Sequence, residues 1–241
     1  MRLHRFSGSF DFSQRVVHAH DKKLCNQLKN VLRLNVHDQV ILSNMDRKEA
    51  HALITGLTPT TASFEILDVY DNPHEPNVSV TLYCSLLKKE NFEWVAQKAT
   101  EIGIKELVPL IASRTIKTGF SPERISAIIT EAAEQAGRGI VPTLGSAHIF
   151  SDAFSQALKE GDVFVCDREG EALEKAPGYK KSCSIFIGPE GGWDDRELEM
   201  VKNADAHIIS LGNLTLRAET AAIVASYCAV YYLSKKHRSL F

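Results

Sequence analysis

The fold is decided by the stretch IFIGPEGGW, residues 185–193, in which a short apolar run passes directly into a glycine-rich turn. Gly188, Gly191 and Gly192 fall within five positions, and glycine lets a backbone approach a ligand closely or adopt positive φ angles. The turn lacks the Lys-Ser/Thr ending of a P-loop and does not match GxGxxG. It either holds a ligand at the end of a buried strand or simply joins a strand to a helix.

A second stretch with the same organisation is IISLGNLTLRAET, residues 208–220. Because ligands of open parallel sheets bind at the carboxyl ends of the strands, we expect the two loops to meet there. Arg217 would lie at the start of an apolar helix, where a cation opposes the helix dipole. It either forms an ion pair with Glu219 or Glu190 that fixes the loop, or faces an anionic substrate.

The chain divides into two regions with different hydrophobic periodicity. Residues 1–71 contain short alternating runs typical of a small β-barrel, interrupted by one helix over residues 21–31 with Asp21 as its cap. The polar connector DNPHEPN, residues 71–77, places a domain boundary there, and residues 72–241 follow an α/β pattern. The predicted strands of this second domain are 78–86, 107–111, 163–166, 184–187 and 207–211, and the predicted helices are 91–102, 122–137, 152–160, 194–203 and 218–234.

The composition is that of a globular protein, and we expect the chain to stay in the cytoplasm. The 241 residues are 44% hydrophobic and 24% charged, which excludes a disordered or fibrous chain. We find no apolar run long enough for a membrane span and no secretory signal at the start. The five cysteines are scattered without a CxxC pair, so we expect reduced, mostly buried thiols and no metal site.

Positive charge is concentrated at the start of the chain, although the net charge of the whole chain is −2. Residues 1–33 hold seven Lys or Arg against two Asp, a local charge of +5. This segment is either a phosphate-contacting surface or an ordinary solvated face. With Arg138, which ends the predicted helix over residues 122–137, the candidate RNA-binding residues are Arg2, Arg5, Arg15, Lys22, Arg33 and Arg138.

Five blocks of sequence, in order along essentially the whole chain, resemble the RsmE-type ribosomal RNA uridine methyltransferases of the SPOUT class. The blocks are NVLR (30–33), FEWVAQKATEIG (92–103), EAAEQAGR (131–138) with VP (141–142), IGPEGG (187–192), and LG (211–212) with LRAETA (216–221). The resemblance implies a PUA-like β-barrel that helps bind RNA, then an α/β domain with a C-terminal trefoil knot. Periodicity alone indicates an ordinary doubly wound sheet.

The resemblance also implies the cofactor, the substrate and the assembly. In this family the knot loops bind S-adenosylmethionine, two subunits form a homodimer, and the methyl group goes to N3 of a uridine near the decoding region of 16S ribosomal RNA. The chain departs from the family at Gln27, at His37 and at Asn213-Leu214, which stands where Pro-Arg is usual, so we assign no RNA contact to Leu214. The expected cofactor-binding residues are Ile187, Gly188, Pro189, Glu190, Gly191, Leu211, Gly212, Asn213, Leu214 and Leu216.

The implied reaction requires a base and a cation. Uracil N3–H is a poor nucleophile while protonated, so the proton must leave and the negative charge on N3, O2 and O4 must be stabilised. Arg217 is the expected catalytic cation, and it cannot serve as the base because its guanidinium stays protonated. The expected base is Glu219, a group of the partner subunit, or water.

Two other classes of function fit parts of the sequence. A non-catalytic RNA-binding assembly factor would use the basic first domain and keep the α/β domain as a scaffold. A small-molecule enzyme on an ordinary α/β fold would leave the basic segment without a role. The apolar helix over residues 218–234 is either a homodimer interface or is buried within the monomer.

Overall fold

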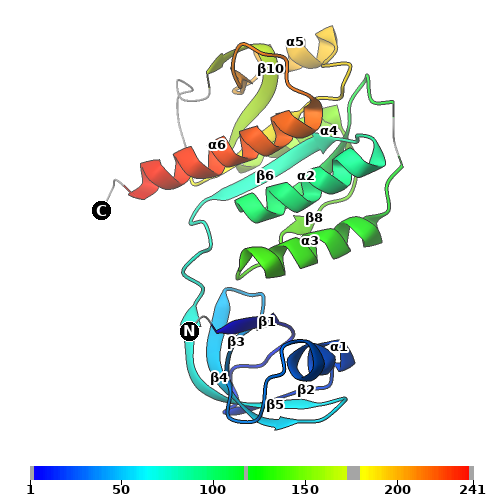
Figure 1. The fold of residues 1–241 in the computed structure, drawn as a ribbon. Coiled ribbons are helices and arrows are strands. Elements are labelled where there is room, and N and C mark those ends of the chain that lie inside the picture. Colours follow the sequence, from blue (N-terminus) through cyan, green and yellow to red (C-terminus); the bar gives the residue numbers. More distant parts are fainter. Residues whose placement is uncertain (1–2, 117–118, 173–179, 239–241) are drawn as a thin grey trace. The chain divides into compact units, whose positions relative to one another are not determined.

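The computed structural model describes residues 3–116, 119–172 and 180–238, which form two compact units (Figure 1). The first unit comprises residues up to 75 together with residues 133–141. The second comprises residues 76–132 and 142 onward. Each unit has its own hydrophobic core, so each is described by itself.

A five-stranded sheet forms most of the first unit, in the order β1-β3-β4-β5-β2. β1 pairs in parallel with β3, whereas the other neighbours are antiparallel. Alternate side chains such as Leu42, Ile54 and Phe64 are buried in one core, which confirms the predicted β-rich first region. The strands are β1 (His4–Ser7), β2 (Val16–Ala19), β3 (Gln39–Ser43), β4 (Lys48–Leu57) and β5 (Ala62–Asp71).

The helix predicted over residues 21–31 is only half α-helical. Asp21 caps it as expected, because its Oδ1 accepts from the Lys23 and Leu24 amides at 2.7 and 3.2 Å. After α1 (Lys22–Asn26) the chain widens into a π-helical turn, η1 (Gln27–Val31), whose end is marked by the Leu32 amide donating to the Gln27 carbonyl at 2.9 Å. The predicted helix is therefore present over residues 22–31, but residues 27–31 are π-helical rather than α-helical.

A buried network of charged side chains lies within the first unit. Arg138 forms an ion pair with Glu75 at 3.1 Å, and their side chains are 7% and 5% exposed. Arg5 forms an ion pair with Glu49 at 2.7 Å and also donates to the Arg138 carbonyl. Asn72 donates to the same Glu49 oxygen at 2.6 Å. The network ties residues 133–141 to the β-sheet of this unit.

The second unit is built on a parallel sheet of seven strands, in the order β12-β10-β11-β6-β7-β8, with β9 also paired to β7. The parallel sheet confirms the predicted α/β class. β8 and β9 were not predicted, because two residues each give no periodic pattern. The strands are β6 (Ser79–Ser85), β7 (Glu106–Ile111), β8 (Thr143–Leu144), β9 (His148–Ile149), β10 (Asp162–Ala172), β11 (Ser182–Ile187) and β12 (His207–Ser210).

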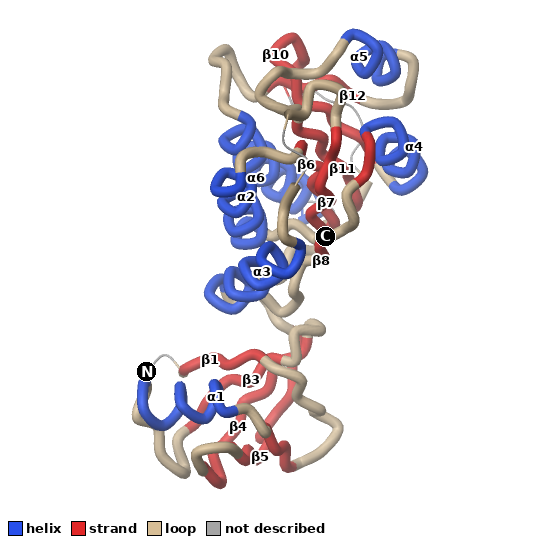
Figure 2. The backbone as a smooth tube through the Cα atoms, turned by 90° about the vertical axis from the view of Figure 1, so that its right-hand side faces the viewer, coloured by secondary structure: helices blue, strands red, loops and turns tan. Residues whose placement is uncertain are grey.

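Helices cover both faces of this sheet. Figure 2 shows α2 and α6 on one side of the strands and α4 on the other. The side of α4 holds an aromatic core in which Phe186 packs against Tyr83, Phe150 and Phe154. No helix in the described ranges has the length and hydropathy needed to cross a bilayer. The helices are α2 (Lys89–Ile102), α3 (Pro122–Ala136), α4 (Phe150–Glu160), α5 (Asp195–Lys202) and α6 (Ala218–Arg238).

We expect Arg138→Ala to destabilise the first unit by about 3 kcal/mol, because it leaves the buried Glu75 carboxylate without its partner. Arg15→Ala is the matched control: Arg15 is also paired, with Glu65, but its side chain is 83% exposed, so the loss should stay below about 1 kcal/mol. The free energy of unfolding of the first unit alone is measured in urea, with hydrogen exchange of peptides from β4 and β5 as the probe. Equal stability of the two variants would contradict the structural role of Arg138.

Candidate active site

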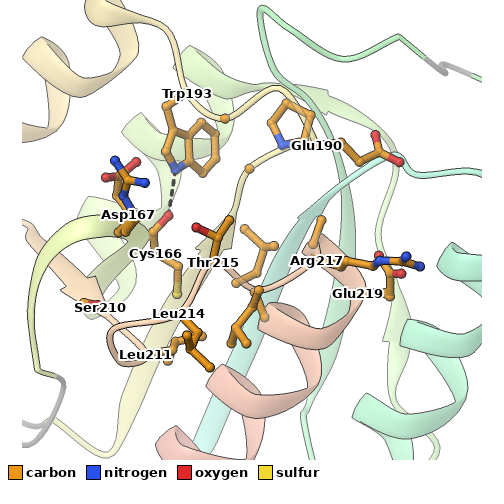
Figure 3. A pocket seen from close by; sticks show the side chains of 18 of the residues that line it. Cys166, Asp167, Glu190, Trp193, Ser210, Leu211, Leu214, Thr215, Arg217 and Glu219 are labelled. Atoms are coloured by element: carbon orange, nitrogen blue, oxygen red, sulfur yellow. Dashed lines mark hydrogen bonds between the residues drawn. The ribbon is translucent and has the colours of Figure 1, made fainter.

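A cavity with a volume of about 610 Å³ opens at the carboxyl edge of the parallel sheet in the second unit. Five segments line it: the loops that follow β11 and β12, a bend within β10, and the starts of α2 and α6. Figure 3 shows Arg217 and Glu219 on one side of this cavity and Asp167 and Trp193 on the other. The two loops singled out in the sequence therefore meet at one site.

The loop after β11 is fixed by Trp193, which is buried. The indole Nε1 donates to the Cys166 carbonyl at 2.9 Å, so this loop is joined to β10 (Figure 3). A Cβ at Gly188 would lie 3.1 Å from the indole ring, tighter than most real contacts. Gly188 thus lets the tryptophan close over the start of the loop.

The bend within β10 contributes two charged residues that the sequence analysis did not select. The pairing of β10 with β12 changes register between Cys166 and Glu171, so β10 bulges between these two residues. Asp167 and Arg168 lie in this bulge and line the cavity. A Cβ at Gly170 would lie only 2.4 Å from a backbone atom of Ile209, so only glycine fits there. The signal was present in the sequence as a charged tripeptide and glycine directly after an apolar run.

The loop after β12 turns sharply at Gly212. The φ angle of Gly212 is +124°, which side chains other than glycine rarely adopt, and its amide donates to Ser210 Oγ at 3.3 Å. Ser210 Oγ in turn donates to the Gly212 carbonyl at 3.1 Å. Leu211, Leu214 and Leu216 form the apolar side of the cavity, and Leu214 is 80% exposed.

Two charged residues at the start of α6, Arg217 and Glu219, line the cavity. Arg217 is exposed and Glu219 is 5% exposed, and within the described ranges neither makes an ion pair. Burial, together with the negative charge of Glu219, raises the pKa of the Cys84 thiol. The structure therefore contains no Arg217 ion pair with Glu219 or Glu190, the loop-fixing alternative raised by the sequence.

Most of the expected cofactor-binding residues line the cavity, but Gly191 and Asn213 do not. The Gly191 carbonyl instead accepts from Arg114 Nη1 at 3.1 Å. Ile187, Gly188, Pro189, Glu190, Leu211, Gly212, Leu214, Leu216, Arg217 and Glu219 all contribute to the lining. The lining also includes residues that were not among the predicted site residues: Lys88, Asn91, Cys166, Asp167, Arg168, Gly192, Trp193, Ile209, Ser210, Thr215, Ala218 and Ala221.

The candidate RNA-binding residues differ in their surroundings. Lys22 and Arg33 are exposed, and Arg15 is exposed beside Glu65. Arg5 and Arg138 belong to the buried network of the first unit, which places their side chains to stabilise that unit rather than to reach a phosphate. Arg2 lies outside the described residues.

Neither metal clusters nor disulfides occur in the part of the chain that the structure describes. No group of three His, Cys, Asp or Glu side chains there is arranged to hold a metal ion. All five cysteines are free thiols, and Cys25, Cys84 and Cys183 are buried.

Comparison with known proteins gives consistent results. Residues 74–229 match the family model described as the RNA methyltransferase domain. The ribosomal RNA small subunit methyltransferase E of Bacillus subtilis is 28% identical over 219 residues, covering 83% of this chain and 84% of that protein. The protein of the same description from Mesomycoplasma hyopneumoniae is 30% identical over 176 residues, covering 70% and 77%.

A solved structure extends the similarity to nearly the whole chain. The crystal structure of a ribosomal RNA small subunit methyltransferase E from Neisseria gonorrhoeae, bound to S-adenosylmethionine, superposes with a TM-score of 0.86 at 25% identity. The superposition covers 96% of this chain and 98% of that one.

We expect Trp193→Phe to destabilise the second unit by about 1–2 kcal/mol, because the part-buried Cys166 carbonyl loses its hydrogen-bond donor. The other tryptophan supplies the control: Trp94 is 47% exposed, and Trp94→Phe should stay within about 0.5 kcal/mol of the wild type. Urea unfolding monitored by circular dichroism compares the two. If both variants were equally stable, the indole bond would not hold the loop.

Proposed function

The chain belongs to the RsmE family of small-subunit ribosomal RNA methyltransferases, and on this premise we propose that it transfers a methyl group from S-adenosylmethionine to N3 of a uridine in 16S ribosomal RNA. The observation that carries the proposal is the cavity formed by the loops after β11 and β12, with Arg217 and Glu219 at its edge. A substrate in ribosomal RNA also assigns the activity to the cytoplasm.

The cavity suits S-adenosylmethionine in size and chemistry. A volume of about 610 Å³ lies within the range of small-molecule sites. Leu211, Leu214 and Leu216 offer apolar contact to an adenine, while the backbone groups of the two glycine turns offer hydrogen bonds to its edge. When bound, S-adenosylmethionine supplies an electrophilic methyl group on a sulfonium.

Two residues of the chain would act on the uridine. The N3 proton must pass to an acceptor before or as the methyl group arrives, and we assign that role to the Glu219 carboxylate, which is buried in the cavity wall. The Arg217 guanidinium would balance the negative charge that spreads over N3, O2 and O4. Because Arg217 is exposed and makes no ion pair among the described residues, its charge is available to a substrate.

The first unit would contribute the RNA-binding surface. Arg15, Lys22 and Arg33 are exposed cations on this unit and fit phosphate contacts that add affinity without reading sequence. The trefoil knot also stays part of the proposal. It is compatible with a chain that leaves β11 and places β12 on the opposite side of β10 from β11.

The proposed function is tested by mass spectrometry of small-subunit ribosomal RNA from cells with and without the gene. We expect one 3-methyluridine to disappear when the gene is deleted and to return when it is restored. RNA with an unchanged set of methylated uridines would contradict the proposal. A chain that binds the RNA but shows no saturable binding of S-adenosylmethionine would instead be the assembly factor.

Arg217→Ala should lower kcat by about a hundredfold while leaving the affinity for S-adenosylmethionine within about twofold, because the cation acts on charge that develops in the transition state. Arg217→Lys should recover only part of the rate, since a point charge replaces a planar fork. The control is Arg196→Ala, because Arg196 is an exposed arginine on α5 that does not line the cavity; this variant should keep full activity. A loss of cofactor affinity large enough to explain the whole loss of rate would make Arg217 structural.

Homodimer formation is a further part of the proposal, and α6 supplies the candidate interface. One side of α6 is buried within the second unit through Ala222, Ala225 and Leu233. Tyr227 and Tyr231 are instead 57% and 47% exposed, and their stacked rings have centroids 5.9 Å apart. An exposed aromatic pair on an apolar helix fits a self-complementary contact.

Sedimentation at micromolar concentration should therefore give a species of twice 26.7 kDa. Tyr231→Glu should shift this species toward the monomer, because the interface would have to bury a carboxylate. A wild-type chain that sediments as a monomer would contradict the dimer.

A further inference from the structure

Lys88 lies at the cavity but on neither of the two glycine-containing loops. It is the residue that precedes α2, and it follows the carboxyl end of β6. Its side chain is exposed and lines the cavity, and Asn91, one turn further along α2, lines it too. Across the described ranges no carboxylate forms an ion pair with Lys88.

The charged residues that line the cavity differ in the roles proposed for them. Of the acidic residues in the lining, Glu219 is buried without an ion-pair partner among the described residues, which suits the proton acceptor assigned to it. Arg217 is the cation at the start of α6. Lys88 is a further cation in the same cavity, beside Arg217 and Arg168. It is contributed by a different strand end, and the chemistry proposed for the base does not use it.

An RNA strand that places a uridine in this cavity must bring its own phosphates to the rim. Each nucleotide carries one negative charge, and lysine is a common binder of phosphate as a point charge. The start of α2 favours an anion as well, because its cap residue offers no side-chain hydrogen bond to the first-turn amides. The first turn of α2 also contains one acidic residue, Glu90, whose side chain is exposed to solvent.

We infer that Lys88 binds a backbone phosphate of the substrate RNA beside the target uridine, which gives the second unit its own RNA contact. The inference rests on the proposed function, because it takes the uridine to enter this cavity. The neighbouring Lys89 is also exposed but does not line the cavity, so it provides a control of the same charge one residue away.

The test compares Lys88→Ala, Lys88→Arg and Lys89→Ala in the full chain, using unmodified small-subunit ribosomal RNA transcribed in vitro. Affinity for the RNA is measured at several salt concentrations, and affinity for S-adenosylmethionine is measured separately. Each phosphate contact contributes about 0.7 to 0.9 to the slope of log affinity against log salt. Lys88→Ala should reduce the slope by about that amount and raise KM for RNA, whereas Lys88→Arg and Lys89→Ala should keep the wild-type slope.

The outcomes of the Lys88 and Lys89 variants bear on the inference alone. An unchanged slope in Lys88→Ala overturns it, and so does an equal loss in Lys89→Ala, which would indicate a general charge effect. Weakened S-adenosylmethionine binding with an unchanged RNA slope would assign Lys88 to the carboxylate of the cofactor instead and would also overturn it. Failure of the wild-type chain to methylate the RNA would contradict the proposed function, whereas the salt slope reports on Lys88 independently of turnover.

Discussion

The pairing of β10 with β11 on one side and β12 on the other holds the cavity together. Parallel pairing brings the carboxyl ends of these strands to one edge, so the loops that follow β11 and β12 emerge at the same edge, on either side of β10. The close approach of Gly170 to Ile209 permits the bulge in β10, and the Trp193 bond to the Cys166 carbonyl then joins the loop after β11 to the same strand. A change in either contact would alter the walls of the cavity.

The arrangement of charge follows from this framework. α6 begins at the end of the loop that follows β12, so this loop brings Arg217 and Glu219 to the cavity. Arg217 stays exposed while Glu219 is buried, although the two residues are only two positions apart on the helix. One helix start thus presents a solvated cation and a buried carboxylate, an arrangement that fits the proton removal and anion stabilisation of the proposed reaction.

The sequence was informative wherever function depends on strand ends. Short apolar runs followed by glycine identified both loops, and the helix predicted over residues 194–203 is present as α5, which opens with a capping box of Asp194 and Glu197. The bulge in β10 was missed because it depends on how Gly170 meets Ile209, a contact between residues far apart in the chain. Arg138 shows the opposite error: its position at a helix end suggested a surface cation, but its burial depends on Glu75, which periodicity cannot pair with it.

A crystal structure of this chain with S-adenosylmethionine tests the central claim most directly. The account predicts electron density for the ligand in the cavity, with its adenine against Leu211, Leu214 and Leu216 and its methyl group facing the start of α6. Density for the ligand at another site, or in this cavity with the methyl group turned away from Arg217 and Glu219, would contradict the account.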